Sequence, residues 1–294
     1  MKIVVGVDTQ GLYESAINIL TRAQLNGLEL HLVHVIENLF AFNPIPYPGP
    51  AFETAQVLEK IEKDSKELVE KACEELKQKK IQAKAVILRG HPVDQISHYA
   101  EEISADMIAT GSEKKGTLGS LFFGSVTRGL VIGASKSILI AKGEVSDSGK
   151  LKAVLATDHS DYNTKAIKQL VKIAPQGFEK ITVVTAYDKP PKGFEMFEYD
   201  APELTGEAVQ SMEQELHNRN NKIIESLAPL GAKCESRVQM GNTNEVLHTT
   251  MEETGSDLLI TAAQGHGFVE RVTIGSITFH QVVSEPYSVC VIRA

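Results

Sequence analysis

The chain has 294 residues, 42% of them hydrophobic and 23% charged, which is typical of a globular protein and long enough for two domains. The formal net charge of -8 argues against general binding to nucleic-acid phosphates, which needs clustered lysine and arginine, so we expect no nucleic-acid partner. No apolar run approaches the roughly 20 residues that span a bilayer, and the three cysteines lie far apart without a zinc-binding spacing. We therefore expect a cytoplasmic protein without a membrane partner, a metal site or a disulfide scaffold.

Short β-branched runs alternate with amphipathic segments along the first half of the chain. The runs predict five strands, at residues 2–7, 29–36, 82–88, 105–110 and 137–141. A long segment between the second and third runs has apolar residues at helical spacing, namely Ile61, Leu68, Val69, Ala72 and Leu76. The second half has a similar segment, with Val209, Met212, Leu216, Ile223 and Leu227. This alternation predicts βαβ units and a parallel sheet covered by helices on both faces.

The second half of the chain repeats the first. "KIVVGVD" at residue 2 matches "KAVLATD" at residue 152, which places Asp8 against Asp158 at an offset of 150. Later matches share an offset of 151, among them Gly90 with Gly241, Asp106 with Asp257, and Gly124 with Gly275. Such regular matches indicate a tandem duplication.

The expected fold class is α/β, with two repeated domains at residues 1–142 and 151–294. A polar stretch at 143–150 is expected to link them. Each domain is expected to be an open parallel five-stranded sheet. Two Pro-rich, aromatic stretches at 38–55 and 188–206 follow the second strand of each half. Each predicts either a surface loop or a flap over a pocket or partner surface, and both interpretations stay open.

Three features converge at the carboxyl ends of the predicted strands, where open parallel sheets bind ligands. Asp8 or Asp158 ends the first strand of its half and can accept hydrogen bonds from ribose hydroxyls. Backbone groups near the end of the second strand can meet a base, and the glycine-bearing loop after the fourth strand can approach phosphate oxygens. The residues expected near the base are Val35 and Ala186. The residues expected at the helix starts are Gly124, Ser125 and Val126 in the first half and Gly275, Ser276 and Ile277 in the second. Each serine is expected to cap its helix.

The whole chain resembles two universal stress protein domains in tandem. Nucleotide-binding members of that family carry an Asp at the end of strand one. After strand four they carry Gly, two residues, Gly, nine residues, and then Gly with Ser or Thr. The first half matches at Gly111, Gly124 and Ser125 but has Lys114 at the middle glycine, and the second matches at Gly265, Gly275 and Ser276 but has Ala262 at the first.

The resemblance implies an adenine nucleotide alpha hydrolase-like fold and binding of ATP or a related adenine nucleotide, with Mg²⁺, in one or both halves. It also implies antiparallel pairing of the final strands, so that the halves form a pseudo-dimer, and it leaves a homodimer open. We favour the second half as the nucleotide site, because Lys114 replaces a conformationally permissive glycine, although its ammonium group could instead meet a phosphate.

The function expected from the resemblance is that of a stress-response regulatory protein. No general base or metal-holding carboxylate cluster is evident, so we assign no catalytic residue and expect at most slow ATP hydrolysis. His266 and His159 lie near the expected pocket, and His34 is expected to be a core histidine with a hydrogen-bond partner. The alternative is an interaction scaffold with degenerate nucleotide loops, or a binder of another, apolar ligand enclosed by the two flaps.

Overall fold

A computed structural model describes residues 1–37, 51–112, 124–143, 149–188, 206–263 and 274–293. The first half contains the helices α1 (Tyr13–Arg22), α2 (Ala51–Gln78), α3 (Pro92–Glu102) and α4 (Ser125–Gly133). Its strands are β1 (Lys2–Gly6), β2 (Glu29–Ile36), β3 (Gln82–Arg89), β4 (Met107–Ser112) and β5 (Ser137–Lys142). Within this half the strands alternate with the helices, as the sequence predicts.

The second half repeats this order of elements. Its helices are α5 (Asp161–Ile173), α6 (Gly206–Leu227), α7 (Thr243–Thr254) and α8 (Ser276–Ser284), and a short 3-10 turn covers Ala228–Leu230. Its strands are β6 (Leu151–Ala156), β7 (Phe178–Tyr187), β8 (Lys233–Met240), β9 (Leu258–Ala263) and β10 (Ser288–Arg293). The described part of the chain has no helix that is both long and apolar enough to cross a membrane.

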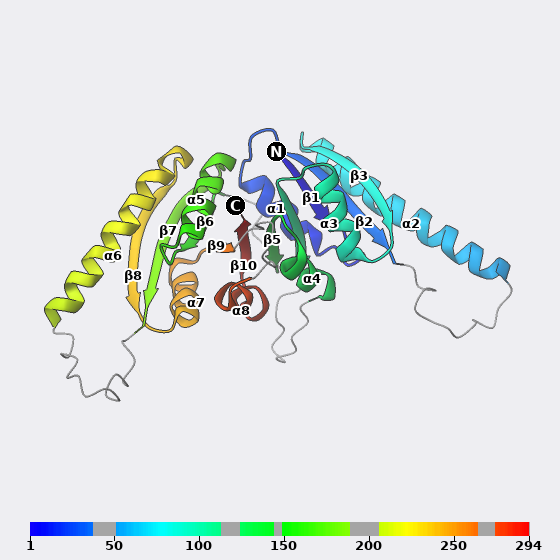
Figure 1. The fold of residues 1–294 in the computed structure, drawn as a ribbon. Coiled ribbons are helices and arrows are strands. Elements are labelled where there is room, and N and C mark those ends of the chain that lie inside the picture. The colour runs from blue at the N-terminus through cyan, green and yellow to red at the C-terminus, as the bar shows by residue number, and fades with distance from the viewer. Residues whose placement is uncertain (38–50, 113–123, 144–148, 189–205, 264–273, 294) are drawn as a thin grey trace, which may run out of the picture.

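The ten strands of the described residues belong to one sheet, in the order β3-β2-β1-β4-β5-β10-β9-β6-β7-β8. Neighbouring strands are parallel within each half, and β5 pairs antiparallel with β10 where the halves meet. Figure 1 shows this seam in the middle of the molecule, with the long helices α2 and α6 at opposite ends. The expected α/β fold and the pairing of the final strands are thus confirmed.

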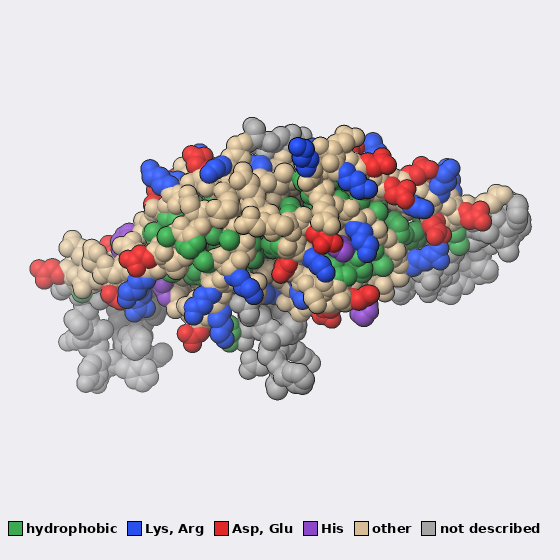
Figure 2. Space-filling model, turned by 90° about the horizontal axis from the view of Figure 1, so that it is seen from above, with side chains coloured by type: hydrophobic (Ala, Val, Ile, Leu, Met, Phe, Trp, Pro, Cys, Tyr) green, Lys and Arg blue, Asp and Glu red, His purple; other side chains and the backbone are tan. Residues whose placement is uncertain are grey.

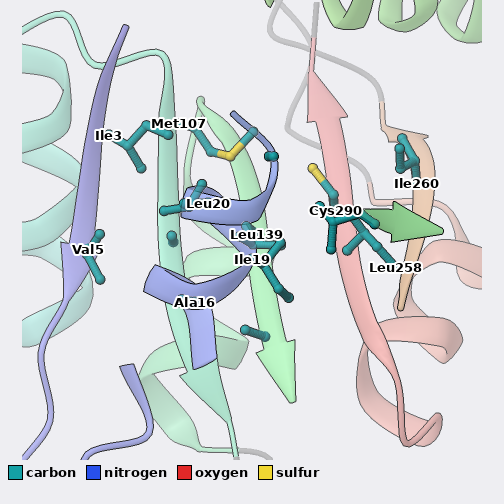
Figure 3. Packing of buried hydrophobic residues seen from close by; sticks show 14 of the residues in the cluster. Ile3, Val5, Ala16, Ile19, Leu20, Met107, Leu139, Leu258, Ile260 and Cys290 are labelled. Carbon is teal, nitrogen blue, oxygen red and sulfur yellow. The ribbon is translucent and has the colours of Figure 1, made fainter. Parts of the chain in front are cut away.

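Alternate side chains of each strand enter two apolar cores, one on each face of the sheet. Ile3 and Val5 point toward α1 and α2, whereas Val4 points toward α3 and α4. Each core also continues across the seam. Figure 3 shows Leu139 of the first half and Cys290 of the second in the same cluster. The halves therefore share their cores, and burying both faces explains the continuous β-branched runs of the strands.

Two details of the sequence prediction differ from the structure. The stretch 38–55 was expected to be a surface loop or a flap, but α2 already begins at Ala51. The rest of that stretch and most of 188–206 lie outside the described residues. On the predicted face of α2, Val69, Ala72 and Leu76 are buried, and Leu68 is half-buried and packs against the same core. Ile61 is half-buried because the first turns of this long helix extend past the sheet edge (Figure 1).

Candidate functional site

Two equivalent cavities lie at the carboxyl ends of the strands, each where the strand order reverses. In the first half the reversal lies between β1 and β4, and in the second between β6 and β9. The first cavity has a volume of about 440 Å³ and the second of about 380 Å³. These volumes lie within the range of pockets that hold small molecules.

The structure places the predicted site residues around these two cavities wherever it describes them. The first cavity is lined by Asp8, Val35, Gly111, Gly124, Ser125 and Val126. The second is lined by Asp158, Ala186, Ala262, Gly275, Ser276 and Ile277. Lys114, Gly265 and His266 lie outside the described residues.

The two strand-end aspartates have different hydrogen-bond partners. The Asp8 carboxylate accepts backbone N–H groups from Gln10 at 2.8 Å, Leu12 at 3.1 Å and Tyr13 at 3.0 Å, so it holds the start of α1. Asp158 is exposed and accepts one backbone N–H, from Ser160 at 2.9 Å. Counting only bonds from the described residues, the second cavity therefore offers the carboxylate with more free acceptor capacity.

Ser160 explains that difference. Its side chain accepts the backbone N–H of Asn163 at 3.2 Å and caps α5, so Asp158 is not needed as a cap. In the first half no serine occupies this place, and α1 begins after Leu12 without a side-chain cap from that residue. The same turn is thus built in two ways, and in the second half the carboxylate stays available.

The glycines expected to approach phosphate have distinct structural roles. Gly124 and Gly275 are the N-cap residues of α4 and α8, and nothing lies within 4 Å of a Cβ built on Gly275. A Cβ on Gly111 would lie within 3.0 Å of the backbone of Leu12. Gly111 is therefore required by the packing of the chain against β4, whereas the matching Ala262 is accommodated in β9.

The expectation that Ser125 and Ser276 cap their helices is wrong. Each serine is the first helical residue, the N-cap is the glycine before it, and neither cap makes a side-chain hydrogen bond. The first residues of both helices thus line the cavities, and their glycine N-caps supply no capping side chain. Because the first N–H groups of a helix carry the positive end of the helix dipole, each cavity has an arrangement suited to an anion.

Sequence reasoning missed a pair of threonine hydroxyls in each cavity. Thr110 and Thr127 lie 3.4 Å apart between their Oγ1 atoms, and Thr261 and Thr278 lie 3.1 Å apart. All four residues are buried and line the cavities. The signal that could have found them is the offset of 151, which relates both members of each pair.

The histidines near the cavities have local partners. His34 Nδ1 lies 2.8 Å from the carbonyl oxygen of Val7, which confirms a partner, although His34 is half-buried and lines the first cavity. His159 has a φ of 58° and places its Nε2 atom 3.0 Å from Thr185 Oγ1. Burial lowers the pKa of His159, which favours the neutral ring as a hydrogen-bond partner of Thr185.

The charges that line the cavities are acidic. Asp8 and Glu37 line the first cavity and Asp158 lines the second, and the described lining residues include no lysine or arginine. No group of three or more His, Cys, Asp or Glu side chains in the described part of the chain is placed to hold a metal ion. On the face shown in Figure 2, acidic and basic side chains are interspersed.

A polar cluster joins α7 to α8 in the second half. His248 Nδ1 lies 2.6 Å from Glu285 Oε2, and His280 Nε2 lies 3.4 Å from Glu285 Oε1. His248 Nε2 is also 3.4 Å from Glu252 Oε1. The matching positions of the first half hold Ser97, Gly129 and Ala134 in place of the two histidines and Glu285. This polar cluster is therefore a property of the second half.

Replacing His248 by glutamine should destabilise the protein more in mild acid than in mild alkali. The hydrogen bond with Glu285 raises the pKa of His248, although burial opposes it. The stabilisation is fully present below the unfolded pKa of about 6.5 and is lost as pH rises through the raised folded value. Since the side chain is 40% exposed, we expect about 1 kcal/mol or less.

The measurement is the free energy of unfolding of wild type and H248Q at about pH 6 and about pH 8.5, on either side of the histidine range. His98→Gln is the control, because His98 is exposed and the described structure gives it no ion pair. An H248Q penalty that is equal at both pH values would contradict the assignment.

Comparison with known proteins places the chain in a family. The model of the universal stress protein family matches residues 1–142 and again 151–293. A universal stress protein from Archaeoglobus fulgidus has a similar structure, with a TM-score of 0.66 and 18% identity over 99% of this chain and 98% of that one. A functionally unknown protein from Pseudomonas aeruginosa PAO1 matches with a TM-score of 0.60 and 11% identity, over 99% of this chain and 92% of that one.

One curated relative also matches locally. The stress response protein NhaX of Bacillus subtilis is 45% identical over 56 residues, which is 19% of this chain and 34% of that protein. The match is local, whereas the family model covers both halves. The chain is a tandem member of the universal stress protein family.

Proposed function

We propose that this protein binds ATP or a related adenine nucleotide, with Mg²⁺, and serves as a cytoplasmic regulatory protein of a stress response. The observation that carries the proposal is the pairing, in each half, of a strand-end aspartate with a helix N-terminus whose N-cap is a glycine, around one cavity. The carboxylate suits ribose hydroxyls and the helix start suits phosphate oxygens. The family match and the local similarity to NhaX support the stress-response part of the proposal.

The second cavity is the better candidate of the two. Asp158 is exposed and accepts one backbone N–H, whereas Asp8 already accepts three. The helix start at Gly275 is open, with nothing within 4 Å of a Cβ built there. A ligand hydroxyl can thus reach the Asp158 carboxylate without displacing the bonds that hold a helix.

A different ligand is the second candidate, and it applies most to the first cavity. That cavity is lined by Asp8 and Glu37 and, among the described residues, by no lysine or arginine. Two carboxylates disfavour a triphosphate unless Mg²⁺ or an undescribed residue offsets their charge. An acidic cavity of this kind is expected if the first half no longer binds a nucleotide and the chain acts as an interaction scaffold.

Changing Gly275 to valine should weaken nucleotide binding at the second cavity by about tenfold or more, because the added methyl groups cover N–H groups that would contact phosphate. The fold should survive, since Gly275 has a φ of -61° and open space around it. Gly124→Val is the matched variant for the first cavity, where the nearest atom to an added Cβ is 4.0 Å away. The measurement is calorimetric titration with ATP and AMP in the presence of Mg²⁺.

Mass spectrometry of small molecules released from the purified protein should come first. One adenine nucleotide per chain, lost in G275V and kept in G124V, would support the second cavity as the site. Two per chain would mean that both cavities bind. An absence of both released nucleotide and titration heat would overturn the proposal, and unchanged affinity in G275V would overturn the site assignment.

A further inference from the structure

The helices that begin at the two cavities end at the seam between the halves. Helices α4 and α8 each have nine residues, so each spans about 13 Å from its cavity to its last turn. The last four carbonyl groups of a helix have no partner within the helix. In both helices a cation reaches these carbonyl groups, and it comes from the opposite half.

Lys142, the last residue of β5 in the first half, reaches the end of α8 in the second. Its Nζ atom donates to the carbonyl oxygens of Val282, of Gln281 at 3.5 Å and of Glu285 at 2.7 Å. Only 6% of Lys142 is exposed. The ammonium group therefore binds the carbonyl end of α8 inside the protein, where solvent screens its charge little.

Arg293, the last residue of β10, makes the reciprocal contact. Its Nη2 atom donates to the carbonyl oxygen of Val131 in the last turn of α4, at 2.6 Å. Arg293 is also 6% exposed, and burial lowers its pKa to about 10, so it is still a cation at neutral pH. Val131 and Val282 stand 151 positions apart, as do Lys142 and Arg293, so the two contacts are equivalents exchanged between the halves.

Two serines fix the strands that carry these cations. Ser137 Oγ accepts the backbone N–H of Arg293 at 3.0 Å, and Ser288 Oγ accepts the backbone N–H of Lys142 at 3.0 Å. Each cation thus stands on a strand end that is itself bonded across the seam. A displacement of one half would move the cation away from the helix of the other.

We propose that each half completes the anion-binding helix of the other, with Lys142 supporting α8 at the second cavity and Arg293 supporting α4 at the first. A cation at the carbonyl end of a helix offsets the negative end of its dipole and leaves the N-terminus more favourable for an anion. Lys142 and Arg293 are positioning residues that touch no ligand. This inference rests on the proposed binding of nucleotide phosphates. Its consequence is that the nucleotide affinity of each cavity depends on a side chain of the other half.

The test uses full-length protein in two backgrounds, G275V, which keeps the first cavity, and G124V, which keeps the second. Lys142→Met should weaken ATP binding about three- to tenfold in the G124V background and leave the G275V background unchanged. Arg293→Met should do the reverse. Arg293→Lys, which restores the charge, should restore the affinity that R293M loses.

Two outcomes of the titration would overturn the proposal. One is that each substitution weakens the cavity of its own half, and the other is that both cavities weaken equally, as general loosening would cause. If one background binds no nucleotide, as expected for G275V when only the second cavity is a site, hydrogen exchange tests the crossed contact of that cavity. If neither background binds, the proposed function fails, and hydrogen exchange tests both crossed contacts. K142M should then speed exchange in the last turn of α8 but not of α4, and R293M the reverse, whereas equal exchange in both helices would contradict the arrangement.

Discussion

Replacing Gly111 by alanine should destabilise the protein by about 3 kcal/mol or more, although the change adds a single methyl group. Gly111 lies in β4, and a Cβ there would be within 3.0 Å of three backbone atoms of Leu12 and Tyr13. Neither neighbour can give way alone, because the backbone N–H groups of both residues donate to the Asp8 carboxylate. Either β4 or the start of α1 must therefore move, and chemical denaturation would measure the loss.

Ala262→Gly is the matched control, because Ala262 is the equivalent residue in β9. Removing its methyl group should cost roughly 0.5–1 kcal/mol through backbone entropy in the strand. The pair separates a packing role from a ligand role at this position of the family motif. If G111A unfolded like wild type and lost only nucleotide affinity, Gly111 would be a binding glycine and the packing argument would be wrong.

Local sequence patterns were sufficient to predict most of the fold. The run at residues 29–36 coincides with β2, and the run at 137–141 covers β5 except its last residue. These strands were predictable because both of their faces are buried, which requires continuous apolar and β-branched residues. The internal repeat also predicted that Asp8 and Asp158 occupy equivalent positions in the two halves, and each of them lines the cavity of its half.

The features that could not be predicted depend on contacts between distant segments. The glycine at 111 matched a family motif, but the packing reason for it lies about a hundred positions earlier, at Leu12. Lys142 and Arg293 look in sequence like ordinary charged residues at the ends of strands. Only the antiparallel pairing of β5 with β10 shows that each is buried against a helix of the other half.

Gly177 holds a second contact between the halves, away from the crossed cations. Its backbone N–H donates to the carbonyl oxygen of Ala23 at 3.0 Å, and its own carbonyl oxygen accepts the N–H of Leu151 at 2.8 Å. Beside it, Arg22 forms a salt bridge with Asp257 at 3.2 Å, and the Arg22 side chain is 8% exposed. The end of α1 is therefore bonded directly to the second half.

Gly177→Ala should open this contact and destabilise the protein by about 2–3 kcal/mol. A Cβ on Gly177 would lie within 3.0 Å of the backbone of Arg22 and Ala23, so the two segments must separate and the bond to Ala23 must lengthen. Separation also exposes the Arg22–Asp257 pair to solvent screening. Gly133→Ala is the control, because a Cβ there meets nothing within 4 Å and alanine favours the helix. Denaturation together with hydrogen exchange at the end of α1 would check both variants, and a G177A protein with wild-type stability and protection would show that this contact does not join the halves.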